Sequence, residues 1–450
     1  MHSLFIFRRD LRLDDNTALN EALERSETVS CVFILDPRQA KPENEYFSAN
    51  AFAFMVESLI ELETDFEKRG GRLAIIEGRA PDVVAQLLED PYDAVFVNRD
   101  VTPFSKKRDE DIRTECEKRG CAFHSYDDVM LNPPESVLTN EKPYRVFTPY
   151  WKAARERDVR APRTTRGTFG EPNGMRARDI AVPEASPQRT IKGGRREALR
   201  ILTNISRYHS YKDERDTPSE QGTTRLSAHL KFGTISPREL VHAIRRELSD
   251  HELERQLYWR DFYHQLLAHH PHVLGREFDR TYEGIEWSEP GERFEAWKSG
   301  RTGFPIVDAG MRELARTGWM HNRVRMITAS FLTKDLHIDW REGEKHFARN
   351  LVDYDPANNN GGWQWAASTG ADAAPYFRIF NPWLQQKRFD PQAAYIKQWI
   401  GELAHLSARE IHALENTRPD GLEYPEPIVD HAVERAEAIA RYKSTRGQKP

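Results

Sequence analysis

Tryptophan is the residue type in this chain best suited to electron-transfer chemistry. The 450 residues include ten tryptophans, and two of them stand in the stretch 358–382, NNNGGWQWAASTGADAAPYFRIFNP. Indole is easily oxidised and its radical is delocalised, so closely spaced rings allow an electron to move in steps. For any single tryptophan in a helical protein, the alternative is that the ring fills core volume. The stretch is therefore a candidate for redox chemistry.

A second candidate site is the segment 222–227, GTTRLS. Gly222 is followed by the hydroxyls of Thr223 and Thr224 and by Arg225, ahead of an apolar run. Hydroxyls, a guanidinium and the backbone amides that open a helix together suit a phosphate group. The alternative is that the threonines only cap the helix that follows. Both interpretations stay open on this motif alone.

The histidines of HQLLAHHPH, 264–272, are weak candidates for a metal site. Their spacing lacks the i,i+4 pair that puts two ligands on one helix face, and Pro271 would end the helix. We therefore expect no metal. The chain also has no P-loop, no G-x-G-x-x-G after its first strand and no Cys-x-x-Cys among its three cysteines. A Rossmann nucleotide site, an iron–sulfur cluster and a disulfide framework are therefore not expected.

Short apolar runs alternate with amphipathic ones in the first 130 residues. The short runs, rich in β-branched and aromatic residues, predict buried strands at 3–7, 29–35, 72–77 and 94–98. The longer periodic runs predict helices at 17–25, 49–69 and 81–88, the first capped by Asp14 or Asp15. This alternation predicts a parallel sheet covered on both faces.

The chain divides into three parts by pattern. Residues 1–130 form the α/β part, and 131–194 read as a connector with little core, because periodicity vanishes where Pro, Gly, Arg and Thr dominate. Residues 195–450 are almost wholly helical, with helices predicted at 238–248, 252–269, 306–316 and 340–351. The last residues, 444–450, are expected to be frayed. The predicted fold is an α/β parallel-sheet domain followed by a large all-α domain.

The composition is ordinary for a globular protein, with 38% hydrophobic and 30% charged residues and a net charge of -5. With this charge, any nucleic-acid site must be a local basic patch. No apolar run approaches the roughly 20 residues of a membrane span, and scarce cysteine fits a reducing compartment. We expect a cytoplasmic protein without a membrane segment, and a monomer.

Three long segments of the helical part resemble the photolyase/cryptochrome family. They are 220–240, EQGTTRLSAHLKFGTISPREL; 318–344, GWMHNRVRMITASFLTKDLHIDWREGE; and 358–382. The opening FRRDLRLDDN, 7–16, fits the family's first strand and turn. The resemblance covers nearly the whole chain. It implies light-driven repair of cyclobutane pyrimidine dimers in ultraviolet-damaged DNA, by electron transfer from excited reduced FAD to a flipped-out dimer, with FAD bound non-covalently in the helical part.

The resemblance assigns one group of residues to the flavin. The cradle positions match Tyr211, Thr223, Thr224, Arg225, Leu226 and Ser227. Arg325 and Asp353 match an ion pair beside the flavin ring, where a buried charge needs a partner; the alternative is a surface salt bridge. Asp355 matches a further flavin contact. Asn359 matches the residue facing flavin N5, where an amide forms a hydrogen bond but has no readily lost proton; the alternative is a turn of asparagines.

The resemblance assigns a second group to electrons and DNA. Trp363, Trp340 and Trp287 match a chain that carries electrons between the flavin and the surface. Trp259 and Trp365 match walls of the hole that receives the flipped-out dimer, where aromatic faces replace the lost base stacking. The positions on the DNA side, which would contact phosphates, match Arg215, Arg260, Arg323 and Arg378.

The lesion contacts favour cyclobutane dimers. Asn322 and Met326 match dimer-contacting positions at which (6-4) photolyases carry His. At Gln256 the well-known cyclobutane-dimer enzymes carry Glu; Gln makes the same two kinds of hydrogen bond but is a far poorer acid. Gln here also occurs in (6-4) enzymes and animal cryptochromes. The alternatives are therefore (6-4) photoproduct repair and blue-light signalling without repair.

A light-harvesting pigment is expected on the α/β part. The run TPFSKKRD, 102–109, sits where the family binds its antenna, and the Glu expected for a folate is absent there. A deazaflavin or a second flavin is therefore expected, with Asn50, Phe54 and Asp100 as contacts. The alternative is that the basic residues of this run are only the exposed first turn of a helix.

Overall fold

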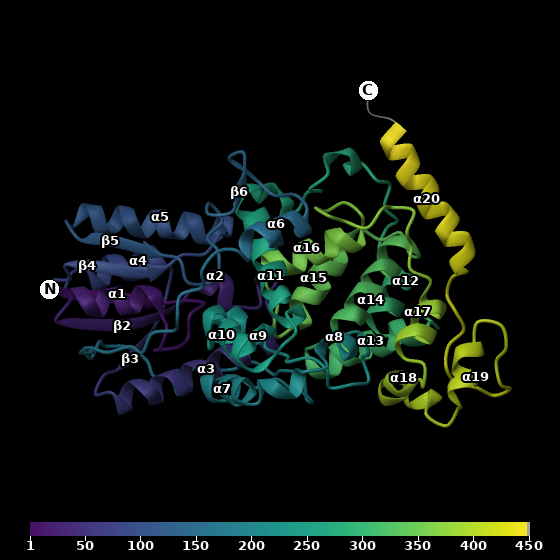
Figure 1. Cartoon of the computed structure of the whole chain (residues 1–450), viewed down its shortest axis with the longest axis horizontal. Helices are drawn as coiled ribbons and strands as arrows, with labels where there is room; N and C mark the ends of the chain where they lie inside the picture. Colours follow the sequence, from purple (N-terminus) through teal and green to yellow (C-terminus); the bar gives the residue numbers. More distant parts are fainter. Residues whose placement is uncertain (448–450) are drawn as a thin grey trace.

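The amino-terminal part is a parallel five-stranded sheet with helices on both faces. The computed structural model describes residues 1–447, and its sheet has the order β3-β2-β1-β4-β5 (Figure 1). The strands are β1 (His2–Phe7), β2 (Thr28–Leu35), β3 (Leu73–Glu77), β4 (Ala94–Asn98) and β5 (Ala122–Tyr126). The predicted α/β fold is confirmed, and the four predicted strands agree with β1 to β4 within one residue at each end. The fifth strand was not predicted.

Helices cover the sheet and make up most of the remaining chain. Around the sheet they are α1 (Thr17–Arg25), α2 (Pro37–Ala40), α3 (Ala49–Lys68), α4 (Ala80–Leu87) and α5 (Pro103–Lys118). The helices that follow are α6 (Phe147–Ala154), α7 (Arg195–Thr203), α8 (Tyr211–Glu214), α9 (Ser227–Phe232), α10 (Pro237–Glu247), α11 (Glu252–His269), α12 (Glu292–Lys298) and α13 (Pro305–Thr317). The last are α14 (Asn322–Lys334), α15 (Trp340–Asn350), α16 (Pro356–Ala366), α17 (Pro382–Phe389), α18 (Ala394–Trp399), α19 (Ala408–Ala413) and α20 (His431–Gly447).

Alternate side chains of β1 enter two separate cores. Phe5 and Phe7 pack with residues of α1 and α3, whereas Leu4 and Ile6 pack with residues of α4 and α5. Side chains of a strand point to opposite faces in turn. Both faces of this sheet are therefore buried, as the strands' continuous apolar runs predict.

The first helix is capped by a residue that was not predicted to do so. Asn16 is the N-cap of α1, and its side chain accepts a hydrogen bond from the Leu19 backbone N–H at 3.2 Å. Asp15 instead lies 2.8 Å from Arg238 of α10, and Asp14 lies 3.1 Å from Arg69. The capping prediction is wrong, because both aspartates are engaged by arginines distant in sequence.

A buried network of charges joins the sheet to the helical part. Arg238 lies 2.6 Å from Asp128, which lies 2.5 Å from Arg12. All of these side chains are at most 7% exposed, so each charge needs its partner. Gly233, at the end of α9, lets this helix approach the backbone at Arg9. A Cβ at its left-handed backbone would meet the Arg9 carbonyl oxygen at 2.1 Å.

The segment 131–194 contributes to two cores, which corrects the expectation that it has little core of its own. It holds a small hairpin, β6 (Leu138–Thr139) and β7 (Lys142–Pro143), and helix α6. Phe147 and Tyr150 of α6 are buried with residues of α11, and Phe169 is buried with residues of the sheet. Aromatic residues in this segment therefore anchor it despite its many prolines and arginines.

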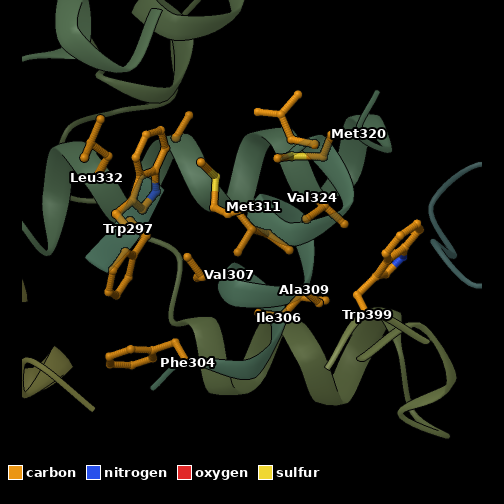
Figure 2. Close-up of a cluster of buried hydrophobic side chains, with 14 of the residues drawn as sticks. Trp297, Phe304, Ile306, Val307, Ala309, Met311, Met320, Val324, Leu332 and Trp399 are labelled. Carbon is orange, nitrogen blue, oxygen red and sulfur yellow. The ribbon is translucent and has the colours of Figure 1, made fainter. Parts of the chain in front are cut away.

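The helical part surrounds one large apolar core. The four predicted helices agree with α10, α11, α13 and α15 within one residue at each end. Helices α13 and α14 pack together, and Trp297, Met311 and Val324 meet between them and α12 (Figure 2). Of the tail expected to be frayed, residues 444–447 belong to α20, and residues 448–450 lie outside the described chain.

Candidate functional site

The loop before α9 presents an arginine without a carboxylate partner. Arg225 has a left-handed backbone, with φ 53°, and its guanidinium lies 4.4 Å over the Trp319 ring. Within the described chain this guanidinium makes no hydrogen bond or ion pair. The threonine N-cap alternative is wrong, because α9 begins after Leu226 with no side-chain cap. A strained cation held without a partner is typical of a ligand site.

Two further arginines gather with Arg225 around His321. They are Arg323, which lies 2.9 Å from Asp216, and Arg325, which pairs with Asp353. Burial, reinforced by these guanidinium groups, lowers the pKa of His321 to about 4, so its imidazole is neutral. His321 Nε2 and Arg323 Nε are buried without a hydrogen-bond partner among the described residues. A third carboxyl group, that of Glu313, accepts from the His321 backbone N–H at 3.2 Å, and burial raises its pKa. The arginines and the buried donors without partners suit an anionic ligand such as the diphosphate of the expected FAD.

Asp353 connects Arg325 to the same loop. It lies 2.9 Å from Arg325 and accepts a hydrogen bond from the Ser227 hydroxyl at 2.6 Å. Its side chain is only 3% exposed, so the pair is not an ordinary surface salt bridge. Tyr211 lies against the neighbouring core, where burial raises its pKa to about 12. The structure thus brings together most of the residues expected to hold the flavin.

Asp355 points away from this group. Its carboxylate contacts Arg9 and lies 3.4 Å from His264 Nε2, and it caps α16 by accepting from the Asn358 backbone N–H at 3.0 Å. Burial opposes ionisation, but His264 and Arg9 hold the pKa of Asp355 well below its usual range. Its carboxylate is therefore occupied at the junction with the sheet, and a flavin contact by Asp355 stays a prediction.

Asn359 lies in the first half of α16 and contacts a buried acid. Its side-chain amide donates to the backbone oxygen of Glu344 at 3.3 Å and to Glu344 Oε1 at 3.4 Å. Burial raises the pKa of Glu344 to about 7. Sequence reasoning missed Glu344, because an acid in a charged helix such as α15 reads as surface until its burial is known.

The three tryptophans expected to carry electrons differ in exposure. Trp363 and Trp340 are 2% and 0% exposed, whereas Trp287 is half-buried and lines an open cleft of about 310 Å³ with Arg276 and Arg341. Gly343 of α15 lets Trp363 approach, because a Cβ there would lie 2.1 Å from its ring. Two of the three rings therefore lie in the core and one reaches the surface, and their role in electron transfer stays a prediction.

Sequence reasoning missed a buried indole beside Trp363. Trp297 is 0% exposed, and its ring centroid lies 6.2 Å from that of Trp363. Its Nε1 donates to the Thr328 carbonyl oxygen at 3.1 Å. In the sequence Trp297 cannot be distinguished from a tryptophan that only fills the core. Its contact with Trp363, which the structure shows, makes it a candidate for electron transfer.

The residues expected at the lesion come from three helices that pack together, with α16 against both α11 and α14. Gln256 and Trp259 lie on α11, and Gln256 Nε2 donates to the Glu252 carbonyl oxygen at 3.1 Å. Asn322 and Met326 lie one turn apart on α14, with Asn322 Nδ2 3.7 Å from Met326 Sδ. Trp365 lies half-buried on α16. All are half-buried or exposed.

The four expected DNA-contacting arginines do not share one environment. Arg378 is exposed, and Arg215 pairs with Glu252 at 3.0 Å, while Arg323 pairs with Asp216. Arg260 is 11% exposed and donates to the carbonyl oxygens of Val129 and Leu230 at 2.6 and 3.3 Å. The structure contradicts a phosphate contact by Arg260, because its guanidinium is buried where α11 meets the sheet domain.

Two of the three expected antenna contacts are enclosed by protein. Phe54 is 0% exposed between the rings of Phe232 and His229, each 5.1 Å away. Asn50 is 4% exposed, donates to the Asn350 carbonyl oxygen at 2.6 Å and accepts from the Ser186 backbone N–H at 2.8 Å. Neither presents a surface to a pigment, because this face of α3 packs against the helical part; the structure contradicts both contacts.

Asp100, the third expected antenna contact, lies beside two partly buried cations. Arg9 lies 3.1 Å from it. Lys231 is nearby, and burial and the charge of Arg9 lower its pKa to about 8; its ammonium makes no hydrogen bond within the described chain. Sequence reasoning missed Arg9 and Lys231, which lie 222 positions apart and meet only at the junction.

The described residues hold no group of three side chains arranged to bind a metal ion. Of the four histidines considered for a metal, His264 is directed to Asp355, and His269 Nε2 lies 3.1 Å from the Pro134 carbonyl oxygen. None of the helices in the described part of the chain has the length and apolar character of a membrane span.

Comparison with known proteins agrees with this arrangement. The model of the DNA photolyase family matches residues 3–166, and that of the FAD binding domain of DNA photolyase matches residues 253–444. The chain belongs to the DNA photolyase family, and its helical part is an FAD-binding domain.

Relatives match over the full length of the chain. A deoxyribodipyrimidine photo-lyase of Alkalihalophilus pseudofirmus is 39% identical over 97% of each chain. The crystal structure of an archaeal photolyase from Sulfolobus tokodaii, which holds two FAD molecules, is 45% identical with a TM-score of 0.92 and covers 99% of this chain and 100% of its own. A cryptochrome of Synechocystis is 26% identical with a TM-score of 0.89, covering 98% and 99%.

Proposed function

We propose that this chain repairs cyclobutane pyrimidine dimers in DNA with light, using FAD. The observation that carries the proposal is helix α16, which packs against α11, α14 and α15 in a chain of the DNA photolyase family. Within two turns it bears Asn359, Trp363 and Trp365. One helix thus combines a hydrogen-bonding amide for the flavin, an oxidisable indole for its photoreduction and an aromatic wall for the lesion.

The residues around Arg225 would hold the cofactor. Arg225 neutralises the diphosphate, with Ser227, Thr223 and Thr224 as hydroxyl donors, and Leu226 and Tyr211 provide apolar contact. The Arg325–Asp353 pair lies beside the ring system. When bound and reduced, FAD supplies the electron that opens the dimer after excitation by blue light. The protein positions the reactants and tunes the polarity of the pocket.

The tryptophans would connect this pocket to the surface. Trp363 and Trp340 are buried and Trp287 faces the open cleft, so an electron from an external reductant enters at Trp287 and moves inward. The half-buried Trp287 is the ring that a reductant in solution can reach. Trp297 offers a second buried neighbour of Trp363.

The half-buried residues of α11, α14 and α16 would bind the lesion. The dimer must leave the base stack, and Trp259 and Trp365 replace that stacking at about 1–3 kcal/mol per base. Gln256, Asn322 and Met326 line the hole and contact the dimer bases. Arg215, Arg323 and the exposed Arg378 lie on the side that meets DNA phosphates.

A second chromophore, a flavin in preference to a folate, is proposed beside Asp100. Arg9 and the unpaired ammonium of Lys231 support an anionic group there, such as a flavin phosphate. The archaeal relative with two FAD molecules supports a flavin in this role. We also propose that the protein acts on damaged DNA in the cytoplasm as a monomer.

One assay tests the central proposal. The purified, chemically reduced protein is incubated with an oligonucleotide bearing one cyclobutane thymine dimer, in blue light and in darkness, and the dimer is quantified by chromatography. We expect repair only in the light. Without such repair, signalling of the cryptochrome kind becomes the better proposal. A parallel oligonucleotide bearing a (6-4) photoproduct separates the two repair specificities.

A further inference from the structure

Helices α6 and α11 interlock through a column of alternating aromatic and guanidinium groups that ends at Trp259. Arg255 and Trp259 stand four residues apart on α11, and Phe147, Trp151 and Arg155 follow at the same spacing along α6 and its end. Residues four apart lie on one face of a helix. The two faces therefore interdigitate, and the helices pack directly.

The contacts within the column are close. The Phe147 and Trp259 rings are stacked with centroids 3.6 Å apart and planes 9° apart. The guanidinium of Arg255 lies 5.4 Å from the Phe147 ring and 4.9 Å from the Trp151 ring, and that of Arg155 lies 5.0 Å from Trp151. Each aromatic ring is thus covered by a neighbour of complementary charge distribution or shape.

Phe147 is the fixed member of this column. It is 0% exposed and lies in a core cluster with Phe262 and Tyr150. Its backbone N–H donates to the Asp372 carboxylate at 3.1 Å, which ties the start of α6 to the segment between Trp365 and the exposed Arg378. Trp259 is half-buried, so one face of its ring is covered by Phe147 while part of the indole stays accessible.

We propose that Phe147 is a positioning residue, which holds the plane of the Trp259 indole so that the accessible part of the indole stacks on the flipped-out dimer. Arg255 contacts the Phe147 ring, and Trp151 in turn contacts Arg255. This inference rests on the proposed function, in which Trp259 is a wall of the lesion hole. Stacking on one aromatic ring changes the affinity for a base by about 5- to 150-fold. If the Trp259 ring had to be ordered on binding, the loss of its conformational entropy would cancel part of this gain in affinity.

The main test measures binding in darkness. Dissociation constants are determined for an oligonucleotide with one thymine dimer and for its undamaged counterpart, and their ratio is the preference for damage. We expect Phe147→Leu to lower this preference about 5-fold. The matched control is Phe294→Leu, which removes a phenylalanine stacked on Trp297, 5.8 Å and 13° away, and keeps the preference of the unmodified protein.

Two further variants guard against misfolding. Thermal unfolding and FAD absorbance first show whether each variant is folded and loaded. If Phe147→Leu is not, Trp151→Leu and Arg255→Met carry the test, because they remove outer layers of the column and leave Phe147 in its core. Each is expected to lower the preference about twofold.

A second readout needs no DNA. In protein labelled with 5-fluorotryptophan, the ¹⁹F resonance of Trp259 is assigned by its loss in Trp259→Phe. Phe147→Leu removes the ring stacked on it, so the resonance shifts and sharpens, whereas Phe294→Leu leaves it in place. If the Trp259 resonance keeps its position in Phe147→Leu, the Phe147 ring does not stack on Trp259 and the proposal is wrong.

The outcomes separate the two proposals. If Phe147→Leu, Trp151→Leu and Arg255→Met all keep the full preference while Trp259→Leu loses it, the positioning role is wrong and the lesion wall stands. If Trp259→Leu itself keeps the preference, the lesion wall is wrong, and the positioning role with it.

Discussion

Glu344 makes the stability of this protein depend on pH in a way that one substitution isolates. Glu344 is 4% exposed. Its carboxyl group accepts from Asn359 and lies near Tyr354 and Tyr46, with Arg341 and Lys345 also nearby. Burial raises the pKa of Glu344 to about 7, against about 4.3 for an exposed glutamate. The folded state therefore keeps this proton to a higher pH than the unfolded state.

The sign and size follow from proton linkage. As pH rises from about 4.3 to 7, the unfolded chain loses the proton first, so the free energy of unfolding falls. The stabilisation is complete below pH 4.3 and is lost as pH rises through 7, for a total of about 3–4 kcal/mol. Glutamine is neutral at every pH, and its Oε1 can accept from Asn359 in the same way.

The variant Glu344→Gln should therefore become more stable than the unmodified protein as pH rises. Between pH 5 and pH 8 the difference in free energy of unfolding should grow by about 2.5 kcal/mol, measured by urea unfolding followed by tryptophan fluorescence. Subtracting the free energy of unfolding of the unmodified protein from that of the variant cancels the contributions of other buried acids. These are Asp261, Asp308 and Asp335, whose pKa values burial also raises to about 6.

The exposed Glu292 of α12 provides the control. Glu292→Gln should leave the difference flat across this pH range. If Glu344→Gln also gives a flat difference, Glu344 is ionised in the folded protein and its pocket is hydrated, which would refute the reasoning from burial.

Three further predictions concern the cofactor and the lesion. Trp287→Phe should lower the rate of FAD photoreduction by blue light at least tenfold, while the chemically reduced variant still repairs; an unchanged absorbance time course would point to a route through Trp297 instead. Arg225→Gln should weaken FAD retention about 10- to 100-fold, because a charge-assisted hydrogen bond is lost; equal retention after gel filtration would exclude Arg225 from the diphosphate site. Gln256→Glu should repair the dimer-bearing oligonucleotide at least as well per photon, and a clear loss would mean that Gln256 does not contact the dimer as proposed.

Local patterns were sufficient for the architecture. Strands β1 to β4 and helices such as α11 and α15 agree with the prediction from the sequence within one residue at each end, because a period of two or of 3.6 is set by neighbouring residues. The fold class followed from the same alternation. The family followed from segments such as 318–344, which are continuous in the chain and carry their spacing with them.

Which residues contact one another in the fold was not predictable from local patterns. Arg260 and Asp15 were expected to face DNA and to cap a helix, and both are instead buried at the junction with the sheet. Glu344 and Lys231 had no local signal at all, although their surroundings shift their pKa values. A charged residue reads the same in sequence whether it is solvated or buried.

The sequence by itself therefore determined which elements form, which family they belong to and which residue types stand at the site. Only the tertiary structure decided which of those residues meet. Phe147 shows the difference: it stands 112 positions before Trp259, in a stretch that resembles a connector, and yet the two rings stack at 3.6 Å. Periodicity is a property of neighbours along the chain, whereas burial, ion pairing and stacking depend on distances that exist only after the helices have packed.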